Sequence, residues 1–267
     1  MNWLKKTAWS IYSYWSFGVF FLLMAFVLPF VILIYWTLEE RRAGKLAFYF
    51  IRFWQQTFCI CTGVRYKFVG KEHLDPKRAY IFVPNHASHL DSPALVAGIP
   101  EQFKALGKQE ILKYPLFGQI FKYLGVTVDR TSVASRRESF KVIRNKIDKG
   151  IHIVIFAEGT MNRTEQLLQP FFDGAFRIAV ETKTPIVPMT ICNARHMLPP
   201  NTLQLRPGDV VSIFGEPIET QHLGLEDVAR LKKEVFEQIK SNLETFEAQR
   251  DPSFITKTNQ TQPLSHV

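Results

Sequence analysis

The stretch AYIFVPNHASHLD (79–91) decides the fold of this chain. Its first part, 79–84, is apolar and rich in aromatic and β-branched residues, which predicts a buried strand. Its second part, Asn85 to Asp91, places an amide, two imidazoles and a carboxylate directly after that strand. Ligands of α/β proteins bind beyond the carboxyl ends of strands, so these residues stand where a site is expected. A histidine and a carboxylate one short turn apart can form a base and its orienting partner, although a loop histidine beside a helix-capping aspartate has the same pattern.

Working outward, short apolar runs alternate with helical patterns along the rest of the chain. The runs predict strands at 64–69, 79–84, 125–130, 151–156, 185–191 and 210–215. The helical patterns fall at 93–98, 115–123, 132–149, 171–182 and 223–248. Pro93 follows Asp91 and Ser92, which is typical of an N-cap with proline in the first helical position. This order predicts an α/β fold, with a mixed, largely parallel sheet flanked by helices, over a domain at 63–249.

The N-terminal part predicts a membrane anchor. No charged residue occurs in 7–38, and a helix of that length is about 48 Å long against a hydrocarbon core of about 30 Å. Tryptophan and tyrosine bracket the most apolar part, 17–35, as in an aromatic belt, and Pro29 is expected to kink the helix. The next segment, 45–62, mixes polar and aromatic residues, which is compatible with an amphipathic interfacial helix or with an ordinary domain helix. We therefore expect 1–62 to be an anchor plus this second helix.

Charges around the anchor predict its orientation. A cleaved signal peptide is disfavoured because the apolar stretch is too long and lacks a small-residue cleavage site. Basic residues after the stretch outnumber Lys5 and Lys6 before it, so the positive-inside rule predicts an inner (cytoplasmic) membrane protein with its catalytic domain on the cytoplasmic side, if the segment spans. The end of the chain, 250–267, is polar and predicts a loose tail.

Composition excludes several classes of protein. The 267 residues are 46% hydrophobic and 21% charged, which excludes a mostly disordered chain and a coiled coil. A mean hydropathy of −0.03 excludes a multi-span transporter. The net charge of +9 suits an anionic partner, either a membrane surface or nucleic acid, but the basic residues are scattered, so no nucleic-acid partner is expected. Three cysteines, Cys59, Cys61 and Cys192, form neither a closed disulfide set nor a zinc site, and no metal is expected.

Three more patterns carry chemistry. Glu158-Gly159-Thr160 ends a predicted strand, and glycine there lets a ligand approach the backbone closely. Arg130 ends another, where a guanidinium suits a phosphate or carboxylate. Val187-Pro188-Met189 lies in a third. Each has a plain structural interpretation when taken alone: a turn, a surface ion pair and a strand with a proline.

Taken together, these patterns are more specific. The order NH-x4-D, an arginine-terminated strand, EGT and VPM resembles the glycerolipid acyltransferase family, in particular the PlsC-like 1-acylglycerol-3-phosphate acyltransferases. The resemblance covers 64–217, includes the segment 108–118, and agrees with an N-terminal anchor.

The resemblance implies a membrane-bound enzyme that moves a fatty acyl group from acyl carrier protein or coenzyme A to the hydroxyl of lysophosphatidate, making phosphatidate. His86 would be the general base and Asp91 its orienter. The remaining implied residues either support the loop, shape the acceptor site or bind its phosphate: Asn85, Glu158, Gly159, Thr160, Arg130 and Lys108. A thioester is already activated, so no cofactor is expected; the sequence holds no P-loop, HExxH or G-x-S-x-G pattern.

Two positions depart from the family pattern and leave the acceptor open. Met161 stands where the family has an arginine after EGT, and the nearest arginine is Arg163. Asp173 stands where a lysine is common. Either Arg163 replaces the missing guanidinium, or the acceptor is another lysolipid, such as a lyso-aminolipid or a lysophospholipid with a full headgroup. A membrane-tethered lipid-binding protein with a decayed site is disfavoured by the intact pair of His86 and Asp91.

Overall fold

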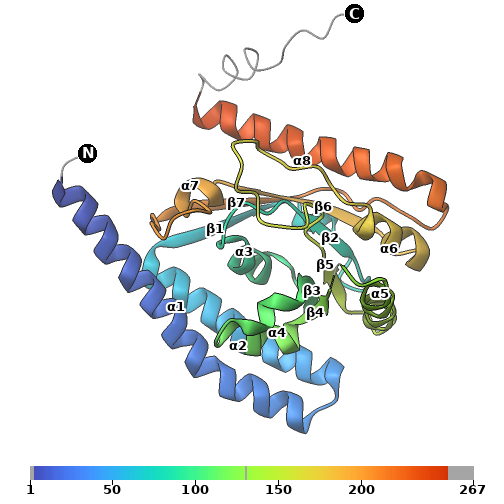
Figure 1. Cartoon of the computed structure of the whole chain (residues 1–267), viewed down its shortest axis with the longest axis horizontal. Helices are drawn as coiled ribbons and strands as arrows, with labels where there is room; N and C mark the ends of the chain where they lie inside the picture. The colour runs from blue at the N-terminus through green and yellow to red at the C-terminus, as the bar shows by residue number, and fades with distance from the viewer. Residues whose placement is uncertain (1–2, 130, 252–267) are drawn as a thin grey trace, which may run out of the picture.

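The computed structural model of the chain describes residues 3–129 and 131–251. Within these ranges a seven-stranded sheet is sandwiched between helices (Figure 1). The strands are β1 (Val64–Val69), β2 (Ile81–Pro84), β3 (Phe103–Lys108), β4 (Gly125–Val128), β5 (His152–Val154), β6 (Ile186–Cys192) and β7 (Gly208–Phe214). The α-helices are α1 (Trp3–Thr37), α2 (Glu40–Thr62), α3 (Asp91–Gly98), α4 (Phe117–Leu124), α5 (Val133–Asp148), α6 (Gly174–Thr182), α7 (Ala194–Met197) and α8 (Val228–Arg250).

The sheet has the order β1-β7-β6-β2-β5-β3-β4. Every neighbouring pair is parallel except β6 and β7. The predicted mixed, largely parallel sheet is therefore confirmed. Because β2, β3, β4 and β5 all run the same way, the segments that follow them emerge at one edge of the sheet, and this edge holds the candidate site.

Alternation along the central strands divides the core between two layers. On β2, Ile81 and Val83 pack with α6 and α8, whereas Phe82 packs with α2 and α3. All three are fully buried, as period-two alternation requires for a strand covered on both faces. Figure 1 shows α6 and α8 over one face of the sheet and α2 and α3 over the other.

Helices α1 and α2 form a hairpin, here called the anchor hairpin (3–62). Aromatic rings join the two helices along their length: Phe20 meets Trp54, and Phe30 stacks on Phe50 at 5.2 Å between centroids. Helix α1 is continuous through Pro29, so the chain does not turn back at that residue. The segment Thr7–Thr37 is long and apolar enough to cross a membrane.

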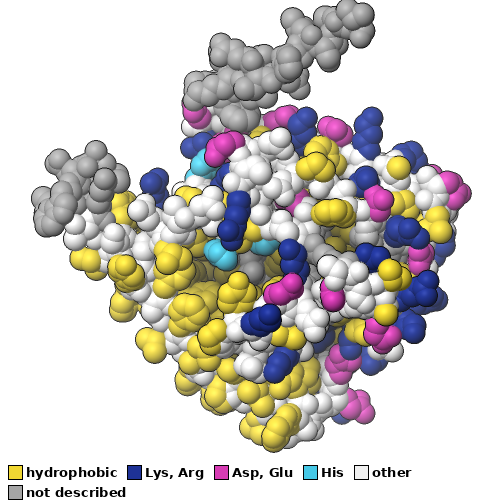
Figure 2. All heavy atoms as spheres, viewed as in Figure 1, with side chains coloured by type: hydrophobic (Ala, Val, Ile, Leu, Met, Phe, Trp, Pro, Cys, Tyr) yellow, Lys and Arg dark blue, Asp and Glu magenta, His cyan; other side chains and the backbone are white. Residues whose placement is uncertain are grey.

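The anchor hairpin presents an apolar face to solvent. Helix α2 buries one side, including Phe48, Ile51 and Phe58, and exposes the other. Figure 2 shows an extended hydrophobic region over the side of the molecule where the two helices lie. The large exposed side chains of the two helices include Tyr14, Trp15, Leu22, Phe26, Leu33, Trp36, Tyr49, Phe53 and Ile60. An exposed apolar surface of this extent is typical of contact with lipid or another protein. One face of 45–62 is buried in the protein, as in an ordinary domain helix, and the interfacial placement of the other face stays a prediction.

Several predicted elements need correction. The strand Phe103–Lys108 and the short helix Ala194–Met197 were absent from the sequence-based prediction. The helix expected at 93–98 begins at Asp91, so Pro93 is not its first residue and Asp91 is not its N-cap. The polar end of the chain lies largely outside the described residues, which stop at Asp251.

Candidate active site

The loop after β2 is held to its neighbours by the side chain of Asn85. Its amide nitrogen donates to the carbonyl of Ile191 at 3.1 Å, and its oxygen accepts from the amide of Ile191 at 2.7 Å. The side chain of Asn85 therefore makes the two hydrogen bonds to β6 that a strand backbone would make, just after β2 has ended. It is almost completely buried, and it fixes the position of the next residue, His86.

His86 and Asp91 form the predicted pair. The Nδ1 atom of His86 lies 2.8 Å from Oδ2 of Asp91, and the same oxygen accepts from the amides of Ala87 at 2.8 Å and Ser88 at 2.9 Å. Asp91 is fully buried, while the imidazole is 19% exposed. With Nδ1 donating to the carboxylate, the Nε2 atom of His86 has a lone pair free to accept a proton. This arrangement matches a general base with an orienting partner.

Phe156 covers one face of the imidazole. The two rings stack with centroids 4.0 Å apart and planes 24° apart. Such a stack fixes the ring orientation and shields one face of the base from water. No signal in the sequence pointed to this role, because Phe156 reads as the last apolar residue of a predicted strand.

Glu158 joins the EGT segment to the histidine loop. Its Oε1 accepts from the amide of His86 at 2.7 Å, and its Oε2 accepts from the amide of Gln169 at 2.9 Å. Burial raises the pKa of Glu158 to about 7, against the opposing effect of those two amides. The carboxylate is therefore a structural clamp between the two loops, in addition to any contact with an acceptor.

Asn162 completes this network. Its amide donates to the carbonyl of His86 at 2.7 Å, and its side-chain oxygen accepts from the amide and hydroxyl of Thr164. Arg195 of α7 donates to the carbonyls of Thr164 and Gln166. Sequence reasoning missed both Asn162 and Arg195. The Asn-Arg-Thr triplet carries an Asx-turn signal that identifies the former, whereas the contact of Arg195 is long-range and has no local signature.

A pocket of about 490 Å³ adjoins these loops. Three residues predicted for the acceptor site, Lys108, Glu158 and Thr160, line it together. Lys108 comes from the end of β3, and Asp129 and Thr131 line the wall beyond β4. Arg130 lies outside the described residues. Gly159 has a positive φ of 76°, a conformation that favours glycine. It therefore provides the turn between Glu158 and Thr160, which both line the pocket.

Arg163 lies on the histidine side of the EGT loop. Desolvation lowers the pKa of His89, and the nearby charges of His86 and Arg163 lower it further. Arg163 is thus within electrostatic range of the loop that carries His86 and His89, and its side chain is exposed. Asp173, the second departure from the family pattern, is paired with Lys232 of α8 at 2.6 Å.

Comparison with known proteins agrees with this geometry. Residues 65–192 match a family model described as Acyltransferase. A 1-acyl-sn-glycerol-3-phosphate acyltransferase from Cocos nucifera is 36% identical over 142 residues, which cover 52% of this chain and 46% of that protein. The human 1-acyl-sn-glycerol-3-phosphate acyltransferase alpha is 28% identical over 180 residues, 65% of this chain and 62% of the relative. The chain thus spans about half to three fifths of the length of these curated relatives.

A solved structure shares the fold. It is the crystal structure of a 1-acyl-sn-glycerophosphate (LPA) acyltransferase, PlsC, from Thermotoga maritima, with a TM-score of 0.78 and 23% sequence identity. The similarity covers 91% of this chain and 98% of that one, and therefore includes at least part of the anchor hairpin as well as the sheet.

Proposed function

We propose, from the match of residues 65–192 to a family model described as Acyltransferase, that this chain transfers a fatty acyl group to the free hydroxyl of a lysolipid, with lysophosphatidate as the acceptor and phosphatidate as the product. The observation that carries the proposal is the 2.8 Å contact between His86 Nδ1 and the buried Asp91. This contact orients the imidazole and leaves its Nε2 atom available to accept a proton. The atom lies at the same edge of the sheet as the EGT loop.

The proposed reaction is direct transfer. Nε2 of His86 takes the proton of the acceptor hydroxyl while its oxygen attacks the thioester carbonyl. Asp91 stabilises the imidazolium that forms. The tetrahedral intermediate collapses by expelling the thiolate, which recovers the proton from the imidazolium. No acyl-enzyme forms, and the energy comes from the thioester, so we propose that neither a metal nor another cofactor takes part.

The acceptor is proposed to bind across the 490 Å³ pocket and the exposed loop beside it. Lys108 and Arg163 supply the positive charge that a phosphate requires. Thr160 supplies a hydroxyl, and the Glu158 clamp holds the wall in place. Arg163 takes over the task that the family assigns to the position now occupied by Met161.

A second acceptor class is favoured by one observation. Met161 brings no charge to the site, and Asp173 is held by Lys232 and faces α8. With fewer cations available, a lysophospholipid or lyso-aminolipid with a larger headgroup is the alternative acceptor.

The donor is proposed to be acyl carrier protein or coenzyme A carrying the acyl group. The apolar face of the anchor hairpin is proposed to enter the membrane, with the catalytic domain on the cytoplasmic side. The large exposed side chains on α1 and α2 support membrane contact, because burying them in lipid removes that area from water.

The test is acyl transfer by protein purified in detergent, with a panel of lysolipids and both donors. Lysophosphatidate acylated by the wild type and not by His86→Ala supports the whole proposal. If the enzyme prefers zwitterionic or amino lysolipids and His86→Ala again abolishes acyl transfer, the proposed acceptor is wrong but the proposed reaction is supported. Undiminished activity in folded His86→Ala contradicts the mechanism.

A further inference from the structure

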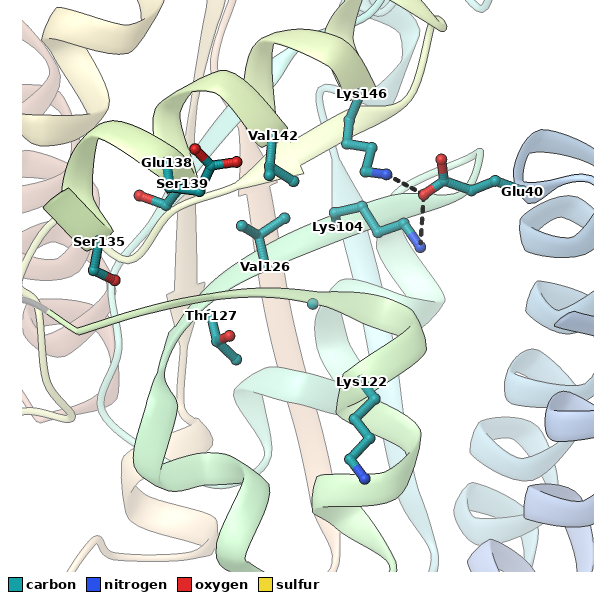
Figure 3. Close-up of a pocket in the computed structure, with 11 residues that line it drawn as sticks. Glu40, Lys104, Lys122, Val126, Thr127, Ser135, Glu138, Ser139, Val142 and Lys146 are labelled. Carbon is teal, nitrogen blue, oxygen red and sulfur yellow. Dashed lines mark hydrogen bonds and ion pairs between the residues drawn. The ribbon is translucent and has the colours of Figure 1, made fainter.

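A second charged cluster lies where the anchor hairpin meets the edge of the sheet (Figure 3). Glu40, in the first turn of α2, faces three lysines. Lys104 of β3 lies 4.0 Å from Glu40 Oε1, Lys149 lies 3.1 Å from Oε2, and Lys146 of α5 bonds to Oε1. One carboxylate therefore faces three ammonium groups, and two positive charges remain without a counter-charge in this cluster.

The inner lysine is held firmly. The side chain of Lys104 is 5% exposed, and its ammonium group donates to the hydroxyl of Tyr35 at 3.2 Å and to the carbonyl of Tyr123. Burial lowers the pKa of Lys104 to about 8, while Glu40 opposes that shift. Burial thus disfavours the charged form of Lys104, and an additional anion beside the cluster would offset this cost in desolvation.

A pocket of about 300 Å³ opens beside the cluster. Its lining includes Lys104, Lys146 and a further lysine, Lys122 of α4. Figure 3 shows the side chains of Lys104 and Lys146 pointing toward Glu40, with Ser135 and Ser139 at the other end of the pocket. The hydroxyl of Thr127 also lines the pocket.

Few carboxylates line the pocket. Besides Glu40, its lining contains one other carboxylate, that of Glu138, which is 67% exposed and lies 3.6 Å from Lys141 on its own helix. None of the lining residues belongs to the cluster around His86. The pocket is therefore separate from the proposed catalytic machinery.

We propose that this basic cluster binds a phosphate group, carried by an anionic lipid headgroup or by free phosphate, and that Glu40 competes with it for the lysines. Lysine ammonium groups bind phosphate as point charges, and a doubly charged phosphate matches the two positive charges left over. The pocket is large enough for a phosphate and its bound water.

The position of the cluster favours contact with a membrane. It adjoins the turn between α1 and α2, where Trp36 is 82% exposed and Arg41 and Arg42 follow Glu40. If the apolar face enters lipid as proposed above, the cluster lies near the headgroups, where basic residues attract anionic lipid. Binding of a lipid headgroup phosphate by the cluster rests on that membrane proposal, whereas binding of free phosphate does not.

The first experiment measures phosphate affinity by titration of purified protein, with chloride at equal ionic strength as the reference. Glu40→Gln removes the competitor and is expected to tighten phosphate binding at least about tenfold. Lys146→Gln combined with Lys149→Gln is expected to weaken it at least about tenfold. Lys141→Gln combined with Arg144→Gln, two exposed positions of α5, is the charge-matched control and is expected to change it less than twofold.

Lys149→Gln alone provides a variant that keeps the partly buried Lys146, since Lys149 is 43% exposed. It is expected to weaken binding in the same direction by a smaller factor. Equal affinities in the wild type, the lysine variants and the control pair would overturn the proposal, and so would weaker binding in a folded Glu40→Gln protein.

The second experiment distinguishes the two sources. Vesicles of phosphatidylcholine with or without phosphatidate, which makes the surface anionic, are sedimented with each variant. A larger loss for the paired Lys146 and Lys149 variant than for the control assigns the site to lipid headgroups. If the lysine variants weaken binding of free phosphate but sediment with vesicles as the control does, the site is assigned to free phosphate. No lysine-dependent effect in either assay overturns the site, and acyl transfer measured in parallel reports separately on the catalytic proposal.

Discussion

The backbone amide of His86 donates a 2.7 Å hydrogen bond to the carboxylate of Glu158. The bond links the loop after β2 to the loop after β5, so the two sequence motifs are one mechanical unit. Glu158 is buried, and its carboxylate carries this bond together with a second one from Gln169.

Glu158→Gln tests this clamp through pH. Burial raises the pKa of Glu158 from 4.5 to about 7, so the folded state holds its proton more tightly than the unfolded state. The contribution of Glu158 to stability is therefore largest below pH 4.5 and is lost as pH rises to about 7. The free energy of unfolding of the wild type, minus that of Glu158→Gln, is expected to fall by up to about 3 kcal/mol over this window. Urea unfolding at several pH values measures it, and a difference independent of pH contradicts the assignment.

Asp91→Asn tests the orienting carboxylate. Asparagine cannot stabilise the imidazolium, and its amide is able to hold His86 in the wrong tautomer. We expect kcat to fall at least about 100-fold. The change also removes an acceptor for the amides of Ala87 and Ser88, so thermal unfolding must first show a folded protein. The exposed Asp75→Asn serves as the control, and a folded Asp91→Asn with kcat within twofold of the wild type would exclude this role.

Phe156→Leu tests the ring stacked on the base. Leucine keeps an apolar side chain but removes the aromatic contact, which is worth about 0.5–1.5 kcal/mol. We therefore expect kcat to drop by about 2- to 10-fold, with KM for both substrates nearly unchanged. Phe156→Tyr retains the ring and should recover most of the activity. If Phe156→Leu changes KM and not kcat, the ring contacts substrate and does not position the base.

Arg163→Gln tests the proposed replacement for the missing arginine. Loss of a charged hydrogen bond to phosphate costs about 1.5–3 kcal/mol, so kcat/KM for lysophosphatidate should fall by about 10- to 150-fold, mainly through KM. Arg177→Gln, at an exposed position of α6, is the matched control. Equal effects on lysophosphatidate and on a lysolipid without a phosphomonoester would show that Arg163 does not bind the phosphate.

His152→Gln tests a buried histidine outside the site. Burial lowers the pKa of His152 from 6.5 to about 4, and its Nδ1 accepts from the amide of Tyr80 at 3.1 Å. The neutral ring contributes stability that is fully present above pH 6.5 and lost as pH falls toward 4. The free energy of unfolding of the wild type, minus that of His152→Gln, should fall by up to about 3 kcal/mol as pH decreases over that window. Urea unfolding at several pH values measures this difference. His73→Gln, a change at an exposed residue, is the matched control, and a pH dependence of unfolding in His152→Gln that runs parallel to the wild type contradicts the prediction.

The fold was largely predictable because the central strands are buried on both faces and read as apolar runs. Six strands and the resemblance to PlsC-like acyltransferases are confirmed. Strand β3, with the sequence FKALGK, was missed because Lys104 and Gly107 break its apolar pattern. Its position between β5 and β4 is set by tertiary pairing, and its inner lysine donates to Tyr35 of α1 and to the carbonyl of Tyr123 of α4, which no local window contains.

The site was predictable only where motifs are local. The pair of His86 and Asp91 lies within one loop, so spacing alone brought the two side chains together. The Glu158 bond to His86 and the Phe156 stack join residues about 70 positions apart. Such contacts depend on strand order, which periodicity does not determine. The proposed catalytic and binding roles of all these residues stay predictions.

The contact between Ser13 and Leu205 has a consequence for biosynthesis. The hydroxyl of Ser13 on α1 accepts from the amide of Leu205, 192 residues later in the chain. During translation α1 leaves the ribosome long before this partner exists, with its apolar side chains uncovered. A lipid bilayer is able to shelter the helix during that interval. Expression without access to membranes should therefore yield protein that aggregates before its last strands are made.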